Sequence, residues 1–112
     1  MNDKIIGIIG GMGPKATIDL YSKIIDATKI ETEQDHFKVI IYSNPKIPDR
    51  TKAILGLGES PLDALIETGK ALEKLGVEVA CIPCITAHYF IEDVQKELSY
   101  PILNALVEVN KY

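Results

Sequence analysis

The fold is constrained most by three apolar runs of strand length, KIIGII (4–9), FKVIIYS (37–43) and VEVACI (77–82). Segments with helical periodicity separate them, since apolar residues recur every three or four positions over 16–29 and 60–75. Strands that are apolar throughout and alternate with helices are typical of a parallel sheet buried on both faces. The sequence therefore predicts a three-layer α/β domain, in which helices flank a small, mostly parallel sheet.

The borders of these elements are marked by residues that begin or end helices. Ser60 is followed by Pro61, which predicts a helix with Ser60 as its N-cap and proline in its first position, ending at Gly76. A further apolar face predicts a helix over about 89–98. The run YPIL (100–103) predicts the start of a fourth strand.

The composition indicates one domain and excludes several kinds of partner. The chain has 112 residues, 46% of them hydrophobic and 25% charged, which is typical of a single globular domain over residues 1–112. A net charge of −4 argues against nucleic acid or a membrane surface as partner, because both reward clustered lysine and arginine. The first apolar run is too short to span a membrane and lacks a processing site, so a cytoplasmic location is expected.

The three loops that follow the predicted strands are 10–14, 44–51 and 83–88. In a parallel sheet these loops all lie at the carboxyl edge, because every strand runs in the same direction. Open α/β sheets bind their ligands at this edge. We therefore expect the functional residues in these three loops.

The first loop contains Gly11, Gly13 and Ala16, which satisfy the pattern G-x-G-x-x-A between a strand and a helix. A dinucleotide site would also need an acidic side chain near the end of the second strand, where this chain has Ser43 and Asn44. Two interpretations stay open. The loop binds a small anion such as a carboxylate through backbone N–H groups at a helix start, or it is a tight turn without a ligand.

The second loop supplies Arg50, whose planar guanidinium suits a carboxylate held by two parallel hydrogen bonds. A solvated loop arginine is the commoner alternative, with the neighbouring Asp49 as its salt-bridge partner. The position of Arg50 at the same sheet edge as the first and third loops favours a binding role.

The third loop lies within CIPCITAH (81–88) and places Cys84 just before a predicted helix. Unpaired N–H groups and the macrodipole at a helix start stabilise a thiolate, which can act as a base, a nucleophile or a metal ligand. Thr86 is a candidate for the helix cap or for a hydrogen bond to a substrate. His88 is a candidate for a second proton-transfer group or for a buried structural histidine, and a buried structural cysteine is the alternative for Cys84 itself.

Two other chemistries are weaker interpretations of the same loop. Cys81 and Cys84 form a C-x-x-C pair, but a thioredoxin-like site needs its first cysteine exposed at the helix start, and Cys81 lies inside the apolar strand. A zinc site built from Cys81, Cys84 and His88 lacks a fourth ligand, because His36 stands alone in another connection.

The segments IIGIIGGMGPKAT, YSNPKIPDRT and IPCITAHYF closely resemble those of the aspartate/glutamate racemase family, from about residue 4 to residue 104. The resemblance implies one half of a racemase-like fold and racemisation of a small acidic amino acid without pyridoxal phosphate, other cofactor or metal. It implies that Cys84 exchanges a proton with the substrate Cα and that Arg50 binds a substrate carboxylate. The positions implied to line the substrate pocket are Gly11, Met12, Gly13, Ile85 and Thr86.

This sequence departs from the family pattern in two ways. Ile85 stands where the family usually has an asparagine that helps to hold the substrate, and leaving buried polar groups unpaired costs about 1–3 kcal/mol. Racemisation also needs an acid–base group on each face of Cα, and the family supplies the second as a cysteine in a similar second domain. Cys81 cannot replace it, because three residues span at most about 10 Å and Cys81 stands on the strand beside Cys84.

These departures lead to two expectations from different classes. The first is the N-terminal half of a two-domain racemase, completed by a C-terminal domain or by a second copy in a homodimer. The alternative is a non-catalytic domain that binds small carboxylates.

Overall fold

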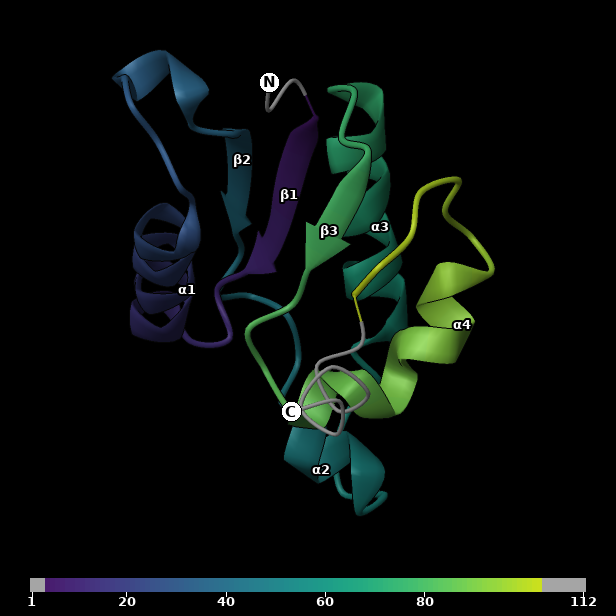
Figure 1. Cartoon of the computed structure of the whole chain (residues 1–112). Helices are drawn as coiled ribbons and strands as arrows, with labels where there is room; N and C mark the ends of the chain where they lie inside the picture. Colours follow the sequence, from purple (N-terminus) through teal and green to yellow (C-terminus); the bar gives the residue numbers. More distant parts are fainter. Residues whose placement is uncertain (1–3, 104–112) are drawn as a thin grey trace.

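Three parallel strands form the sheet of the domain, and helices lie around it (Figure 1). The computed structural model describes residues 4–103. The strands are β1 (Ile5–Gly10), β2 (Lys38–Ser43) and β3 (Val79–Cys81). The helices are α1 (Pro14–Ala27), α2 (Arg50–Ile54), α3 (Leu62–Lys74) and α4 (Ile91–Gln95), with 3₁₀ turns η1 (Glu33–Asp35) and η2 (Thr86–Phe90).

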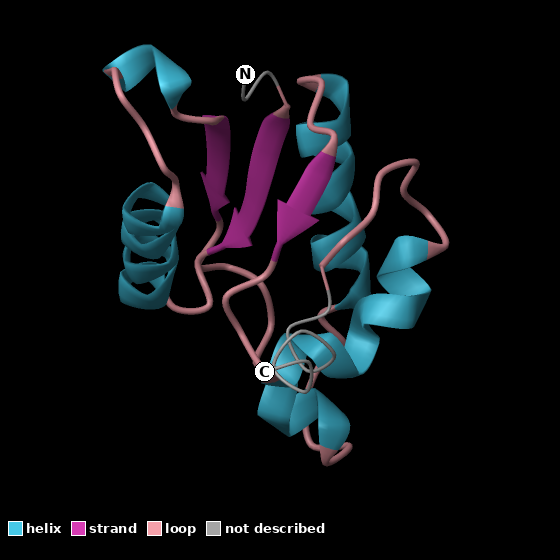
Figure 2. Cartoon of the chain, viewed as in Figure 1, coloured by secondary structure: helices cyan, strands magenta, loops and turns pink. Residues whose placement is uncertain are grey.

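The strand order β2-β1-β3 places the first strand in the centre of the sheet. The connection from β1 to β2 and the connection from β2 to β3 run in opposite directions, so right-handed crossovers put α1 and α3 on opposite faces. Figure 2 shows α1 on one side of the three arrows and α3 with α4 on the other. The prediction of a three-layer α/β fold with a small parallel sheet is confirmed.

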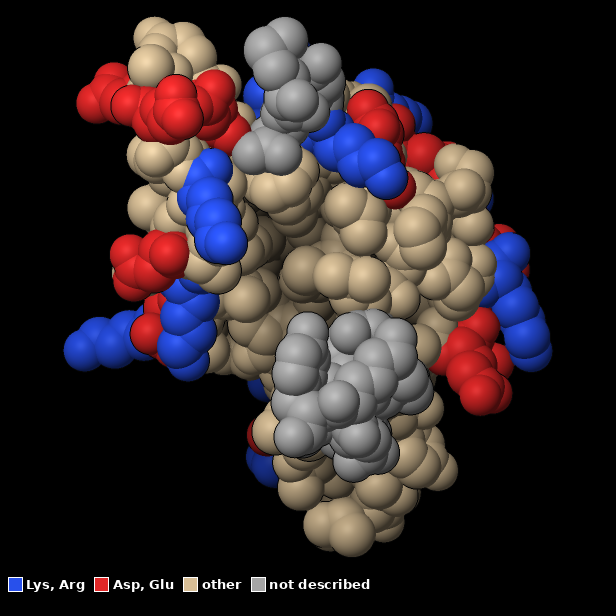
Figure 3. Space-filling model, viewed as in Figure 1, with Lys and Arg blue, Asp and Glu red and all other residues tan. Residues whose placement is uncertain are grey.

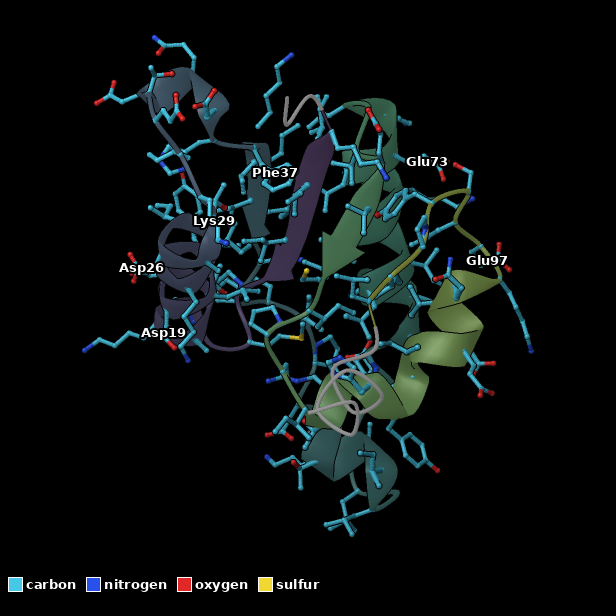
Figure 4. All side chains as sticks on the ribbon, in the orientation of Figure 1. Asp19, Asp26, Lys29, Phe37, Glu73 and Glu97 are labelled. Carbon is cyan, nitrogen blue, oxygen red and sulfur yellow. The ribbon has the colours of Figure 1, made fainter. Side chains whose placement is uncertain are left out.

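The core lies between α3 and the sheet, and α4 packs against α3. Ile8 and Ile9 of β1 are fully buried, and Leu65 and Leu72 of α3 pack into the same cluster as Ile9. Val94 of α4 joins this cluster and is also fully buried. The period of the apolar residues along 60–75 therefore marked the face of α3 that meets the sheet. The charged side chains labelled on α1 in Figure 4, Asp19 and Asp26, point away from the sheet.

Several predicted borders differ from the structure. The helix expected over 16–29 begins earlier, at Pro14. The next helix begins at Leu62 with Pro61 as its N-cap, and Ser60 Oγ accepts a hydrogen bond from the Leu62 N–H over 3.2 Å. The prediction of Ser60 as N-cap and Pro61 as first helical residue is therefore wrong by one position, and Ser60 bonds to the helix start as the residue before the N-cap.

The two predicted elements nearest the carboxyl end of the described chain are shorter than expected. The helix expected over 89–98 is an α-helix only over Ile91–Gln95, because the chain enters it through η2. The fourth strand expected over 100–103 forms a single parallel bridge, between Ala80 and Ile102. Pro101 has no N–H to donate, which limits the ladder at this point.

Tyr100 anchors this last described segment to α3. Its hydroxyl donates a buried hydrogen bond to the Gly69 carbonyl over 2.7 Å. Burial, together with the nearby Glu73 carboxylate, raises the pKa of Tyr100 to about 12. Gln95 adds two further bonds, donating to the Tyr100 carbonyl and accepting from the Ile102 N–H, each over 2.8 Å. The bridge itself consists of two backbone bonds, from the Ala80 N–H to the Pro101 carbonyl over 3.1 Å and from the Leu103 N–H to the Ala80 carbonyl over 2.9 Å, and these side chains reinforce it.

Glu73 forms a second link between α3 and this segment, and it gives the domain a pH-dependent contact. Its Oε2 accepts hydrogen bonds from the Ser99 N–H over 2.7 Å and from the Ser99 hydroxyl over 2.8 Å, in the region labelled in Figure 4. The backbone bond from Ser99, followed by the bond from its hydroxyl, lowers the pKa of the Glu73 carboxyl. A carboxyl whose folded pKa is lowered stabilises the fold above its ordinary pKa, and this contribution is lost as the pH falls through the folded value.

We therefore expect Glu73→Gln to reduce the free energy of unfolding at neutral pH. Wild type and variant should converge as the pH falls below the lowered pKa of Glu73. Urea unfolding followed at a series of pH values measures the difference. Glu67→Gln, which changes an exposed carboxyl on the same helix, is the matched control. A difference between wild type and Glu73→Gln that does not change with pH would contradict this assignment.

The surface carries charges of both signs. On the face drawn in Figure 3, basic and acidic side chains lie next to one another along the left, upper and right margins. Within residues 4–103, no helix is long and apolar enough to cross a membrane.

Candidate active site

The loops after the three strands meet at the carboxyl edge, as the sequence predicts. The Asn44 N–H, directly after β2, donates to the Gly10 carbonyl at the end of β1 over 3.0 Å. The helix α2 from the second loop contacts η2 from the third. Figure 2 shows the three arrows pointing toward this edge, where these two short elements lie.

The glycine loop is held by its own hydrogen bonds. Gly11 has φ +101°, and its N–H donates to Thr17 Oγ1 over 3.0 Å. That hydroxyl in turn donates to the Gly13 carbonyl over 3.1 Å. The Gly11 N–H is thus used inside the loop, whereas the sequence interpretation had it available to an anion. Met12 is 4% exposed and packs in the core cluster, and Gly13 lies exposed at the N-cap of α1.

Arg50 is half-buried at the first position of α2. Its Nη1 donates to the carbonyls of Ile47 and Pro48, each over 3.1 Å. Its Nε is buried and has no hydrogen-bond partner within residues 4–103. Nη1 therefore ties the Arg50 side chain to the loop that precedes α2. The interpretation of Arg50 as a freely solvated side chain is wrong.

Asp49 caps α2, a short helix that the sequence did not predict. Its carboxylate accepts a hydrogen bond from the Lys52 N–H over 2.9 Å. That bond is the main cause of the lowered pKa of the Asp49 carboxyl, and the nearby charge of Arg50 contributes least. The alternative of Asp49 as a salt-bridge partner of Arg50 is therefore wrong: the carboxylate is bound by backbone instead. Aspartate is one of the preferred N-cap residues, so Asp49 itself was the signal in the sequence for a helix start at this position.

Cys84 lies between β3 and η2, and its thiol is partly buried. Its Sγ is 3.2 Å from the hydroxyl oxygen of Thr86. Thr86 forms no side-chain cap on η2, so the capping interpretation of Thr86 is wrong and its hydroxyl contacts the sulfur. The element after Cys84 is a short 3₁₀ turn where the sequence predicted a longer helix.

The residues around the thiol leave this part of the edge open. Ile85 is 72% exposed and Thr86 is exposed as well. The Ile85 side chain has no hydrogen-bonding group, so the residue after Cys84 presents an apolar surface.

His88 is buried, with 8% of its surface exposed, and lies on the inner side of the same turn. Its Nδ1 is 2.7 Å from the carbonyl oxygen of Cys84. Of the two interpretations of His88, the buried structural one fits this position. The signal for it in the sequence was the spacing of four residues between Cys84 and His88.

Cys81 occupies a different environment. It lines a groove of about 520 Å³ beside α1, whose other lining residues include Ile6, Ile24, Phe37, Val79 and Leu103. Burial raises the pKa of the Cys81 thiol. Cys81 and Cys84 are both free thiols. Among the described residues, no three His, Cys, Asp or Glu side chains gather as a metal site would need, so Cys81, Cys84 and His88 do not form one.

We expect Cys84 to be alkylated at least about 10-fold faster than Cys81 in the folded protein at neutral pH, because burial keeps Cys81 in the thiol form and only the thiolate reacts. Iodoacetamide labelling followed by peptide mass spectrometry measures the two rates. In urea both cysteines should react at similar rates, which is the control. Faster labelling of Cys81 in the folded state would contradict the assignment and would restore the redox interpretation of the pair.

The sheet and its loops define a class of protein: an α/β domain that brings a thiol, an arginine and a glycine turn to the carboxyl edge of a parallel sheet. The model of the Asp/Glu/hydantoin racemase family matches residues 9–109, so the chain belongs to this family. The resemblance to aspartate/glutamate racemases predicted from the sequence is thereby confirmed.

Individual relatives agree with this family. The broad specificity amino-acid racemase RacX of Bacillus subtilis (strain 168) is 34% identical, over 96% of this chain and 48% of its own length. The structure of an aspartate racemase from Picrophilus torridus matches with a TM-score of 0.78 and 41% identity, over 90% of this chain and 43% of that chain. An aspartate racemase homologue from Pyrococcus horikoshii OT3 matches with a TM-score of 0.77 and 30% identity, over 99% of this chain and 48% of that chain. The chain therefore spans about half the length of these relatives.

Proposed function

We propose that this chain is the N-terminal, cysteine-carrying half of a cofactor-independent amino-acid racemase that acts on aspartate or a related acidic amino acid in the cytoplasm. Family membership over residues 9–109 supports the reaction class. The observation that carries the proposal is the partly buried Cys84 thiol, 3.2 Å from the Thr86 hydroxyl at the carboxyl edge. Residues 1–112 correspond in this proposal to one of two similar domains.

Cys84 is the proton-transfer group of this half. Its thiolate removes the proton from the substrate Cα, which forms the S–H bond and leaves the electron pair of the C–H bond delocalised into the substrate carboxylate. The Thr86 hydroxyl donates a hydrogen bond to the sulfur and so stabilises the thiolate before the transfer. No metal or organic cofactor takes part in this step.

Arg50 and the glycine turn hold the substrate. Nη1 of Arg50 already donates to two loop carbonyls, so the remaining N–H groups of the guanidinium are the donors for a carboxylate. In this proposal Gly11, Met12 and Gly13 border the substrate through the shape of their turn, because the Gly11 N–H is already bonded to Thr17 and Met12 packs in the core. Ile85 adds an exposed apolar side. In this arrangement the bonds to Ile47 and Pro48 fix the orientation of Arg50.

The second acid–base group comes from outside this chain. Inversion at Cα needs a donor on the face opposite Cys84. Cys81 cannot be this donor, because it is the last residue of β3, the strand that leads into Cys84, and lines another groove. A second domain supplies this donor in our proposal, because the chain covers about half of its relatives. A second copy of this chain is the alternative source.

Proton exchange at Cα tests the proposal. The chain is incubated with L-aspartate or L-glutamate in D2O, and loss of the Cα proton is followed by NMR together with optical purity. Exchange with retention of the L-form is the result expected for a half site, because Cys84 can remove and return the proton on one face only. Racemisation by the isolated chain would indicate a second copy as the source of the opposite donor. No exchange under conditions where the chain is folded would contradict the catalytic proposal.

One observation favours a second candidate function, a carboxylate-binding domain without catalysis. Ile85 offers no hydrogen bond where the family usually has an amide, and it is exposed beside Cys84. Calorimetry with L- and D-aspartate separates the two candidates. Binding without Cα exchange would support the binding domain, and absence of heat with the folded chain would exclude it.

A further inference from the structure

His88 bonds to the main chain of the residue that carries the thiol. The distance from its Nδ1 to the Cys84 carbonyl oxygen is 2.7 Å, which is short for a hydrogen bond between neutral groups. A carbonyl oxygen accepts hydrogen bonds and cannot donate, so Nδ1 must carry the proton. The geometry therefore assigns a proton of the His88 ring to Nδ1.

The other ring nitrogen has no partner. Nε2 of His88 is buried and forms no hydrogen bond within the described part of the chain. With the proton on Nδ1, Nε2 of the neutral ring is an acceptor only. A nitrogen that is buried and carries no proton cannot deliver one to a substrate, which argues against His88 as a proton donor in this half site.

Cys84 is consequently held at two points by the turn that follows it. Thr86 contacts the sulfur, over 3.2 Å, and His88 binds the carbonyl oxygen, over 2.7 Å. The backbone adds a third bond, from the His88 N–H to the Ile85 carbonyl over 3.1 Å. Because His88 is packed into the protein, its ring connects the exposed part of the turn to the core.

We propose that His88 is a positioning residue, whose Nδ1–H bond to the Cys84 carbonyl fixes the direction in which the Cys84 thiol points. This inference rests on the proposed function for its catalytic consequence only. Displacement of a reacting group by about 1 Å can cost about 100-fold in rate, so a small rotation of the Cys84 peptide is enough to matter.

Two substitutions distinguish a donor at Nδ1 from a side chain that only fills space. In His88→Asn, the side-chain amide nitrogen lies close to the place of Nδ1 and can still donate to the Cys84 carbonyl. In His88→Gln, the amide nitrogen lies close to the place of Nε2, and the Nδ1 bond is lost. Both variants replace an imidazole with a smaller amide, so a purely structural role of the ring would affect them alike.

NMR of the full chain without substrate tests the inference independently of catalysis. Imidazole ¹⁵N shifts of His88 should show a protonated Nδ1. Three-bond couplings should show a single Cys84 χ1 rotamer in wild type and in His88→Asn, and averaging between rotamers in His88→Gln. A protonated Nε2 in wild type, or equal Cys84 rotamer populations in the two variants, would overturn the proposal. If His88→Gln fails to fold, the tautomer and the rotamer in folded His88→Asn decide.

Kinetics give the catalytic consequence. Cα exchange should fall about 10-fold in kcat with KM unchanged in His88→Gln, and stay within about twofold in His88→Asn. An equal loss in both variants would contradict the positioning role. If wild type shows no exchange, the proposed function fails, while the tautomer and rotamer measurements still decide the role of His88.

Discussion

Gly11→Ala is expected to destabilise the domain by about 3 kcal/mol or more, because two separate costs add at this position. Gly11 has φ +101°, a conformation that residues with a side chain rarely adopt. A Cβ at Gly11 would also clash with backbone atoms of Asn44, which cannot rotate away as a side chain would. Asn44 in turn is bonded through its N–H to the Gly10 carbonyl, so the first two loops of the site would separate.

Gly13 provides the matched control in the same loop. A Cβ at Gly13 would meet nothing within 4 Å, and its φ of −100° is allowed for alanine. Gly13→Ala should therefore change the free energy of unfolding by no more than about 0.5 kcal/mol. Urea unfolding of the two variants measures the difference, and equal stabilities would show that the loop relaxes around Asn44.

The strands were predictable because their composition leaves little choice. β1 contains four isoleucines in six residues and is paired on both sides, so a continuous apolar run reflects burial on both faces. The same reasoning located the three loops at one edge, since parallel strands share a direction. The helix α2 was missed because RTKAI is too short and too polar to show a period.

Hydrogen-bond partners inside the loops could not be predicted from the sequence. The glycine pattern indicates free N–H groups, but the Gly11 N–H is taken by Thr17, six residues further along the chain. Likewise, Arg50 has the right chemistry for a carboxylate, and the sequence does not show that two loop carbonyls occupy its Nη1. Such partners depend on how each loop closes, which no local pattern specifies.

The turn after Cys84 illustrates the same limit. Phe90, Ile91 and Val94 have helical spacing and do pack toward the core, so the apolar face was predicted correctly. The first residues of the segment nevertheless form a 3₁₀ turn, in which Thr86 and His88 both bond back to Cys84. The sequence predicted Thr86 and His88 as candidate site residues from their chemistry. The structure adds the atom of Cys84 that each of them contacts.

Cys84→Ser is expected to reduce Cα proton exchange with L-aspartate by about 100-fold or more, because a positioned acid–base group contributes about 10²–10⁴ in rate. A serine hydroxyl is a far weaker acid than a thiol and is not ionised at neutral pH, while its size leaves the turn with Thr86 intact. The exchange rate in D2O measures the loss. Calorimetry with L-aspartate should show that binding persists, since Arg50 and the glycine turn are unchanged.

Cys81→Ser is the matched control for Cys84→Ser, because it separates the loss of a proton acceptor from a general effect of replacing a cysteine by serine. Cys81 has the same chemistry, lies three residues away and lines a separate groove, with its thiol kept protonated by burial. It should therefore retain exchange within about threefold of wild type, as expected for a side chain away from the reacting atoms. If both serine variants lost exchange equally, the loss would follow from damage to β3 and not from a missing proton acceptor. If neither lost it, Cys84 would not be the base, and a group other than the two cysteines would remove the Cα proton at this edge of the sheet.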